Sequence, residues 1–225
     1  MANYEISDRR PIADLFREIA HGPTRWCVKA NIHPNTISYA SIVASFGAMI
    51  CFAFSSGATL PLLAGVGFCF LRLYFNMLDG MVAIAANKTS AIGEIANELP
   101  DRISDVLIFL GIGFSQLVHA DAAWTVAILC LLVAYIGTLG KASGAHRDFS
   151  GPMSKPWRMV ALAVGVLAFV LFGCLSGTSF GTSAALLRPY VLDATLIFIA
   201  VGCVVTTFVR LKRIVGALSS QQTRS

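Results

Sequence analysis

Acidic side chains gather in one short stretch of an otherwise apolar sequence. Residues 76–105 read NMLDGMVAIAANKTSAIGEIANELPDRISD. They hold five of the chain's 12 Asp and Glu residues, namely Asp79, Glu94, Glu98, Asp101 and Asp105. An ionisable side chain at membrane depth costs about 2.5–3.5 kcal/mol on insertion scales, so such residues usually mark a functional site. This stretch is therefore the first candidate for chemistry.

The polar and small residues of this stretch fall on two helix faces. One face has members spaced by three, four and seven positions: Asn76, Asp79, Gly80 and Ala83. The second face has a member every four positions: Gly93, Asn97, Asp101 and Asp105. A short turn between the two helices makes them antiparallel neighbours, so we expect the two faces to converge.

Converging carboxylates repel one another unless a positive charge lies among them. Carboxylate and amide oxygens without His or Cys favour a hard cation such as Mg²⁺ or Mn²⁺. The small residues Gly80, Ala83 and Gly93 either let the helices pack closely or leave room for a planar or phosphate group. The spacing is compatible with both interpretations.

The composition indicates that membrane-spanning helices position this cluster. Of the 225 residues, 56% are hydrophobic and 13% are charged, whereas a soluble domain carries roughly 25% charge. We predict an all-α integral membrane protein with a single domain over residues 1–225. Its six-helix bundle covers residues 34–213 and a tail covers 214–225, with spans near 34–54, 58–86, 91–118, 121–140, 157–177 and 190–210.

Residues 1–30 precede the first span and predict an amphipathic helix. The apolar positions Ile12, Leu15, Phe16 and Ile19 lie on one helical face, among basic residues. This pattern is typical of a helix that lies in the membrane interface, and a helix packed on the loops of the bundle is the alternative.

The basic residues are distributed unevenly between the two sides of the predicted bundle. Of the 17 Lys and Arg residues, fourteen fall on the side that holds both termini and the acidic cluster, and Arg188 lies opposite. The positive-inside rule therefore places both termini and the cluster in the cytoplasm. Since the basic residues serve this pattern, they do not indicate nucleic-acid binding.

At this point the residues resemble a known family. The spacing Asn-x2-Asp-Gly-x2-Ala-Ile-x8-Gly-x3-Asn-x3-Asp, from Asn76 to Asp101, is similar to the signature of the CDP-alcohol phosphotransferases. That signature reads Asp-x2-Asp-Gly-x2-Ala-Arg-x8-Gly-x3-Asp-x3-Asp, and every interval is reproduced. The chain departs from it where Asn76 and Asn97 replace aspartates and Ile84 replaces the arginine, which indicates a divergent branch.

The resemblance implies an activity and roles for these residues. A phosphatidyl-type group would pass from a CDP-linked lipid, such as CDP-diacylglycerol, to a small alcohol with release of CMP. Asp101 would be the general base, and the divalent Mg²⁺ or Mn²⁺ would be held by Asn76, Asp79, Asn97 and Asp101. The nucleotide would lie against Asp79, Gly80, Ala83 and Gly93. The resemblance also implies a homodimer in a cytoplasmic membrane, the inner membrane if the source is bacterial.

The departures change the charge of the predicted metal site. Each Asn keeps a carbonyl oxygen but removes one negative charge, so Asp79 and Asp101 supply −2 against the +4 of two divalent ions. Glu94 and Glu98 are candidates to restore charge, as is Asp105. We therefore expect weaker or single-ion binding. A protein of the same fold that binds the lipid without turnover is the alternative function, and a cation transporter is a third.

Basic residues near the cluster are candidates for contacts with a phosphate or the acceptor. Lys155 and Arg158 begin the predicted fifth span, where they either bind a phosphate in place of the missing arginine or anchor the loop at the membrane. Arg102 and Asp105 are further candidates, and for Arg102 a structural ion pair is the alternative.

Overall fold

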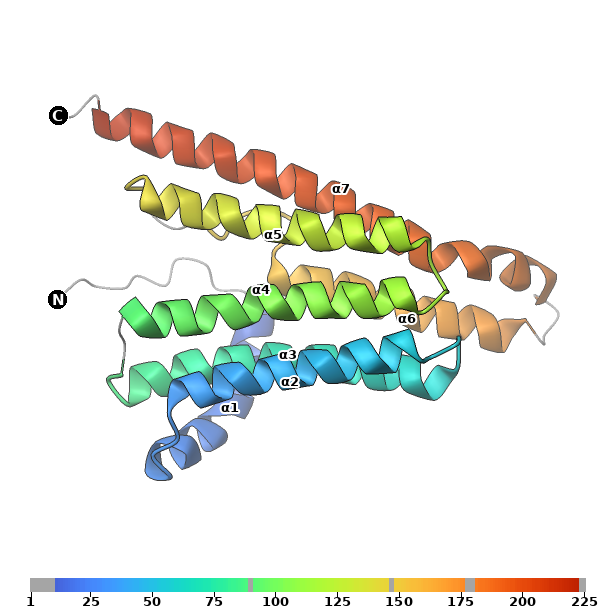
Figure 1. Cartoon of the computed structure of the whole chain (residues 1–225), viewed down its shortest axis with the longest axis horizontal. Coiled ribbons are helices and arrows are strands. Elements are labelled where there is room, and N and C mark those ends of the chain that lie inside the picture. The colour runs from blue at the N-terminus through green and yellow to red at the C-terminus, as the bar shows by residue number, and fades with distance from the viewer. Residues whose placement is uncertain (1–10, 89–90, 146–147, 177–180, 223–225) are drawn as a thin grey trace.

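The computed structural model describes residues 11–88, 91–145, 148–176 and 181–222, without the side chains of 11–19, 91–92, 94, 181–184 and 222. The described residues form seven helices (Figure 1). Their bounds are α1 Pro11–Lys29, α2 Pro34–Ala53, α3 Thr59–Ala85, α4 Ala91–Phe114, α5 Ala120–Ala142, α6 Lys155–Leu175 and α7 Gly181–Gln222.

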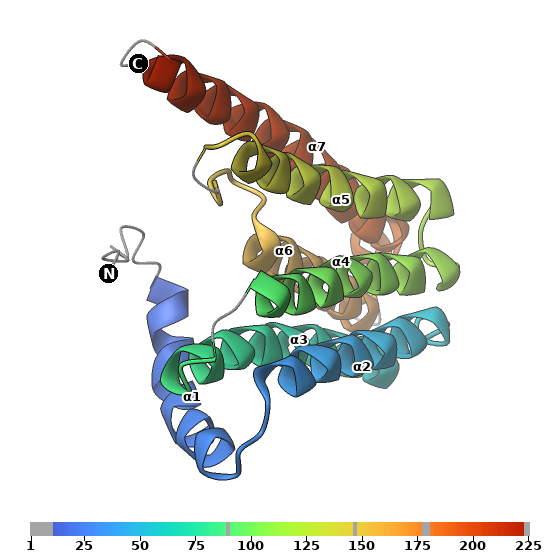
Figure 2. The ribbon, with the colours of Figure 1, turned by 60° about the vertical axis from the view of Figure 1, so that its left-hand side comes forward.

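The helices after α1 form one elongated bundle in which α2 packs along both α3 and α4. On the other side of α4, α5 packs against α4 and α7, and α6 packs against α7 and α3. The predicted neighbours α3 and α4 contact each other over only a small part of their length, whereas α2 packs along both of them (Figure 2). In Figure 1, α6 begins nearer the middle of the bundle than the adjacent ends of α4 and α5.

Five of the six helices after α1 are long and apolar enough to cross a membrane, within the described part of the chain. They are α2, α3, α5, α6 and residues Ala185–Gln221 of α7. The sixth, α4, does not meet the same composition limit because it carries the charged residues of the acidic cluster. The protein is thus an all-α integral membrane protein.

Local chemistry explains where two of the helices begin and end. Pro34 opens α2, and His33 Nδ1 accepts a hydrogen bond of 3.2 Å from the Asn35 backbone N–H. At the other end of the bundle, α4 stops at Phe114 rather than near the predicted residue 118. Ser115 Oγ donates to the Ile112 carbonyl at 2.6 Å and accepts from the Leu117 N–H at 3.2 Å, which forms a turn in place of a further helical turn.

The last helix is longer than the sequence predicts. We expected a span near 190–210 and a tail from residue 214, but α7 continues without interruption to Gln222. The polar residues that suggested a tail are also ordinary helix formers once the preceding turns are in place.

Small residues let α2 approach its two neighbours closely. A Cβ on Gly111 of α4 would lie 2.6 Å from the Met49 Cα of α2, and a Cβ on Gly65 of α3 would lie 2.5 Å from the Phe52 ring. Close helix approach through small residues is the usual packing mode where lipid removes the hydrophobic driving force.

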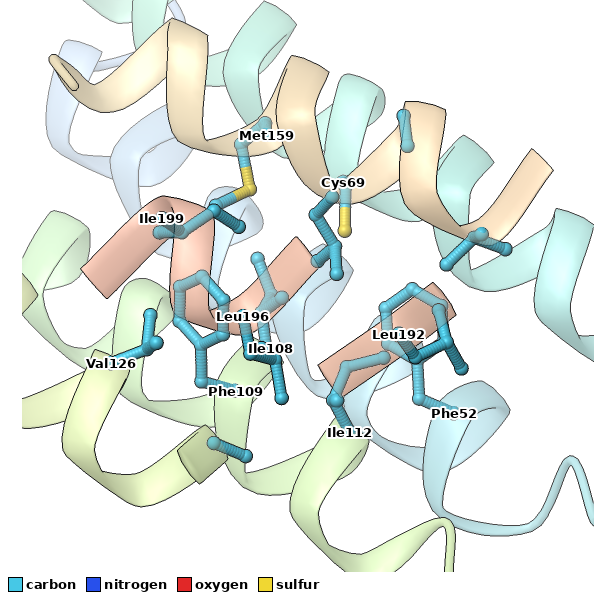
Figure 3. Close-up of a cluster of buried hydrophobic side chains, with 14 of the residues drawn as sticks. Phe52, Cys69, Ile108, Phe109, Ile112, Val126, Met159, Leu192, Leu196 and Ile199 are labelled. Atoms are coloured by element: carbon cyan, nitrogen blue, oxygen red, sulfur yellow. The ribbon is translucent and has the colours of Figure 1, made fainter. Parts of the chain in front are cut away.

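The buried apolar core joins α2–α7 away from the acidic cluster. Its fully buried members include Phe52, Ile108, Phe109, Met159 and Leu196, which point toward one another from four helices (Figure 3). Dispersion contacts in this core fix the helices relative to one another.

The helix α1 lies across the end of the bundle where α3 and α7 finish (Figure 2). Its residues Ala20 and Cys27 are buried against Leu78 and Val82 of α3. The four apolar positions that predicted an amphipathic helix lie among the side chains outside the description.

Candidate active site

Three helices bring the predicted site residues together. Asn76 comes from α3, Asn97 and Asp101 from α4, and Lys155 from the first position of α6. The Lys155 ammonium donates a hydrogen bond to Asp101 Oδ2, and 22% of its side chain is exposed. The two helix faces read from the sequence therefore converge.

The Asn76 amide links all three of its polar neighbours. We assign the Asn76 amide with its oxygen toward Lys155 Nζ, at 2.9 Å, and its nitrogen toward Asp101 Oδ1 and Asn97 Oδ1, each at 3.0 Å, because the reverse orientation would place acceptor against acceptor and donor against donor. In this orientation every contact joins a donor to an acceptor. An amide fits this position because it must accept on one side and donate on the other.

Asp79 lies one turn beyond Asn76 on α3 and is 2% exposed. Ser38 of α2 donates a hydrogen bond to Asp79 Oδ2. The second carboxylate oxygen, Oδ1, is buried and has no hydrogen-bond partner among the described residues. Asp79 is also close enough to Asp101 and Lys155 to interact electrostatically with both.

A buried ion triad lies beneath these residues. Asp105 of α4 forms two ion pairs: its Oδ1 lies 2.8 Å from Arg72 Nη2 of α3, and its Oδ2 lies 3.0 Å from Arg158 Nη2 of α6. Arg72 is 0% exposed, and its Nη2 also contacts the Asp101 backbone carbonyl at 3.1 Å and Asp101 Oδ1 at 3.5 Å. The triad joins three helices, and the charge of Asp105 is taken up by the two guanidinium groups.

The remaining predicted site residues lie around this centre. Arg102 forms an ion pair with Glu98 one turn earlier on α4, which is the structural alternative considered for it. Glu94 lies among the side chains outside the description. A Cβ on Gly80 would meet nothing within 4 Å, and Gly93 is half-buried. Ala83 is half-buried too, whereas the neighbouring Ile84 is 71% exposed, so the position of the missing arginine points away from the centre.

A polar pocket of about 340 Å³ opens beside Asp101. Asn76, Asn97 and Lys155 line it together with Arg158, Arg102 and Glu98. The rest of the lining comes from α5, α7, the 148–154 segment and the start of α6: Val133, Ala134, Gly137, Asp148, Phe149, Ser154, Pro156 and Arg210. The pocket is wide enough for a small polar molecule and holds more positive than negative side chains.

Arg210 of α7 fixes the 148–154 segment over this pocket. Its Nε donates to the Ser150 carbonyl at 3.0 Å and its Nη1 to the Val133 carbonyl at 2.9 Å. Gly151 adopts a φ of +111°, which favours glycine, where a Cβ would lie 2.4 Å from Thr206 of α7. The segment thus enters the bundle, and α6 begins inside it.

Two residues of this site escaped the sequence analysis. Ser38 gave no signal, because a serine in an apolar span more often bonds its own helix backbone. Arg210 is one of the fourteen basic residues on the predicted cytoplasmic side, and only its place at the predicted end of the last span set it near the cluster.

The oxygen ligands fit one divalent cation better than two. Asp79 offers a buried oxygen without a hydrogen-bond partner among the described residues. The amide oxygens of Asn76 and Asn97 each accept one hydrogen bond, from Lys155 and from Asn76, and offer a second lone pair. Both Asp101 oxygens already face cationic groups, those of Lys155 and Arg72. Within the described part of the chain, no three His, Cys, Asp or Glu side chains are placed to hold a metal ion.

Known proteins resemble the chain over most of its length. The "Inner membrane protein YnbA" of Escherichia coli is 26% identical over 161 residues, 72% of this chain and 80% of that protein. A "Phosphatidylinositol phosphate synthase" of Mycobacterium bovis is 26% identical over 73% of this chain and 75% of its own length. An "Archaetidylinositol phosphate synthase" of Aeropyrum pernix is 26% identical over 74% of this chain and 82% of its own length.

Solved structures share the fold. The Mycobacterium tuberculosis phosphatidylinositol phosphate synthase with CDP-DAG bound superposes with a TM-score of 0.67 at 22% identity. The superposition covers 88% of this chain and 94% of the mycobacterial chain. The same enzyme with manganese and citrate also gives a TM-score of 0.67.

The family model provides the decisive match. The CDP-alcohol phosphatidyltransferase model matches residues 31–208, which include α2–α6 and most of α7, with the whole 76–101 motif. With the motif spacing, the converging helix faces and the shared fold, this match shows that the chain is a member of the CDP-alcohol phosphatidyltransferase family.

Proposed function

We propose that the protein transfers a phosphatidyl-type group from a CDP-linked lipid to a small alcohol and releases CMP, as a step of phospholipid biosynthesis. The observation that carries this proposal is the meeting of Asn76, Asn97 and Asp101 beside a polar pocket, at the spacing of the family motif. The donor is of the CDP-diacylglycerol class. The solved relative with CDP-DAG bound supports this choice.

The chemical step needs one base and a leaving group. The hydroxyl oxygen of the alcohol forms a bond to the lipid-bearing phosphorus, and the bond from that phosphorus to the CMP oxygen breaks. The hydroxyl proton passes to Asp101, whose carboxylate borders the pocket. Ionic contacts with Lys155 and Arg72 hold this carboxylate in place.

Residues of α2, α3 and α4 position the donor. Asp79, with Asn76 and Asn97, would hold a divalent cation of the Mg²⁺ or Mn²⁺ class, and Ser38 fixes the Asp79 carboxylate. When bound, that cation supplies positive charge at the pyrophosphate. Gly80, where nothing lies within 4 Å of an added Cβ, leaves the nucleotide space to approach, as do the small residues Ala83 and Gly93.

The pocket favours an acceptor that carries negative charge. Lys155 and Arg158 line it, with Arg102 and Arg210 nearby, and guanidinium and ammonium groups are the usual partners of phosphate. An alcohol that also bears a phosphate group would satisfy them. The phosphatidylinositol phosphate synthases among the relatives support this class of acceptor.

The membrane arrangement follows from the same helices. We propose six spans, with α4 as the sixth, and an active site that faces the cytoplasm with both termini. The excess of Lys and Arg at that end supports this orientation. The helix α1 would lie in the interface, and the protein would act as a homodimer in a cytoplasmic membrane, the inner one if bacterial.

The test uses the purified full chain in detergent with radiolabelled CDP-diacylglycerol, Mg²⁺ or Mn²⁺, and a panel of alcohols with and without a phosphate group. We expect CMP release that depends on the acceptor and on the metal. Asp101→Asn and Asp79→Asn should each abolish it, while Asp121→Asn, an exposed aspartate at the start of α5, should leave it unchanged. Release that survives Asp101→Asn would refute the assignment of the base.

A second function is favoured by one observation. Lys155 forms an ion pair with Asp101, the proposed general base. If this ion pair persists when the CDP-linked lipid binds, the chain binds the lipid without turnover. Saturable binding of the lipid, with no CMP release from any acceptor in the panel, would establish this alternative in place of the transferase.

A further inference from the structure

We propose that Lys155 supplies the positive charge of a second cation, so that the site binds a single divalent ion. The inference deepens the proposed function, on which it rests for the identity of the anion that this ion would meet. Four observations lead to it: the position of the ammonium, the match of Asn76 to it, the charge balance and the position of Lys155 on its helix.

The ammonium lies where oxygen ligands converge. Lys155 Nζ contacts Asp101 Oδ2 and, at 2.9 Å, the Asn76 oxygen, while the Asn76 nitrogen holds Asn97 at 3.0 Å. Three of the four residues at motif aspartate positions are thus organised around an ammonium or the amide bound to it. Asp79 keeps a buried oxygen without a partner among the described residues.

The asparagine at position 76 matches a lysine better than a second metal ion. An aspartate there would face Asp101 across 3.0 Å, and two carboxylates at that distance repel unless cations of high charge separate them. The amide instead donates to Asp101 and Asn97 and accepts from Lys155. We therefore infer that Asn76, in place of the motif aspartate, and the Lys155 ammonium depend on each other.

The buried charges already balance without a metal ion. Three positive groups face three carboxylates in this centre: Arg72, Lys155 and Arg158 against Asp79, Asp101 and Asp105. One divalent ion would add +2, which the two negative charges of a pyrophosphate diester neutralise. A second ion would leave +2 uncompensated in a half-buried site, which is costly.

The position of Lys155 on its helix supports the same conclusion. It is the first residue of α6, after the N-cap Ser154, where the helix dipole disfavours a cation. A lysine is stable there because Asp101 and Asn76 receive it. Since the Lys155 side chain also borders the pocket, its ammonium can move from Asp101 to a phosphate of the bound donor, which leaves Asp101 free to accept a proton.

The test counts bound Mn²⁺ by titration of the purified chain with MnCl₂ alone, followed through the electron paramagnetic resonance signal of free Mn²⁺. We expect no more than one Mn²⁺ per wild-type chain, because the pyrophosphate that would neutralise its charge is not present in this titration. The double variant Asn76→Asp/Asn97→Asp should still bind one Mn²⁺, both when Lys155 is retained and when Lys155→Arg is added. It should bind two Mn²⁺ when Lys155→Met is added instead. Lys212→Met, which removes an exposed lysine of α7, serves as the matched control and should change nothing.

Several outcomes would overturn the inference. It falls if the wild type binds two Mn²⁺, or if the two aspartate substitutions create a second site while Lys155 is retained. Where Lys155→Met shows no cooperative melting transition, Lys155→Gln in the same background makes the comparison. Parallel assays of CMP release separate the proposals: one bound Mn²⁺ without release refutes the transferase alone, and release with two bound refutes this inference alone.

Discussion

The replacement Asp105→Asn tests whether the buried triad holds α3, α4 and α6 together. Asn has nearly the shape of Asp but no charge, and its amide nitrogen would face one of two guanidinium groups. Arg72 is 0% and Arg158 2% exposed, so neither can turn to water. The Arg72 Nε and Nη1 atoms have no hydrogen-bond partner in the described chain, which leaves Asp105 and Asp101 to stabilise this cation.

The magnitude follows from the burial of both partners. Removing one partner of a buried ion pair costs about 3–5 kcal/mol, because the remaining charge is left uncompensated. For a chain of this size, each kcal/mol lowers the melting temperature by about 2–4 °C. We therefore expect Asp105→Asn to melt about 6–20 °C below the wild type.

The assay is thermal unfolding of the purified variants in one detergent. Adding Arg158→Met to Asp105→Asn removes one of the unpaired cations, so the double variant should lose less stability than the two single variants together, by about 0.5–3 kcal/mol. Asp121→Asn, at an exposed position, controls for the loss of an aspartate. A melting temperature of Asp105→Asn within about 2 °C of the wild type, less than 1 kcal/mol would produce, would refute the structural role of the triad.

Two further predictions concern α2. Ser38→Ala removes the hydrogen bond to Asp79 and should cost about 1–3 kcal/mol through an unsatisfied buried acceptor, with slower CMP release; an unchanged rate and melting temperature would contradict it. Gly111→Ala places a Cβ 2.6 Å from Met49 and should cost about 1–3 kcal/mol by thermal unfolding. Gly67→Ala is its control, because a Cβ on Gly67 would meet nothing within 4 Å. If the Gly111→Ala and Gly67→Ala variants melt at the same temperature, α2 and α4 accommodate the added methyl group without cost and the prediction is wrong.

The sequence could predict the helices because apolar runs set their positions. Each of the six predicted spans coincides with a helix, since the runs are long and short polar turns separate them. The ends were less predictable. The hydroxyl of Ser115 ends α4 early, and α7 extends beyond its apolar part because exposed polar residues continue a helix that is already formed.

The sequence could also predict the two faces of the site, because fixed spacing along adjacent helices carries that information. It could not predict the contacts between distant elements. The bond from Ser38 to Asp79 depends on how α2 lies over α3, and the contact of Lys155 with Asp101 depends on where α6 starts. The sequence predicted that Lys155 either binds a phosphate or anchors the loop at the membrane, and its partner in the structure is a carboxylate.

The inward start of α6 bears on the membrane depth of the proposed reaction. From Lys155, α6 has 21 residues and extends about 32 Å, close to the roughly 30 Å thickness of a hydrocarbon core. In the proposed membrane arrangement, its first residue would lie near the level at which acyl chains give way to headgroups. A phospholipid that reaches Asp101 can keep its tails among other tails and its phosphates at their ordinary height, so catalysis would not require the lipid to be lifted out of its leaflet.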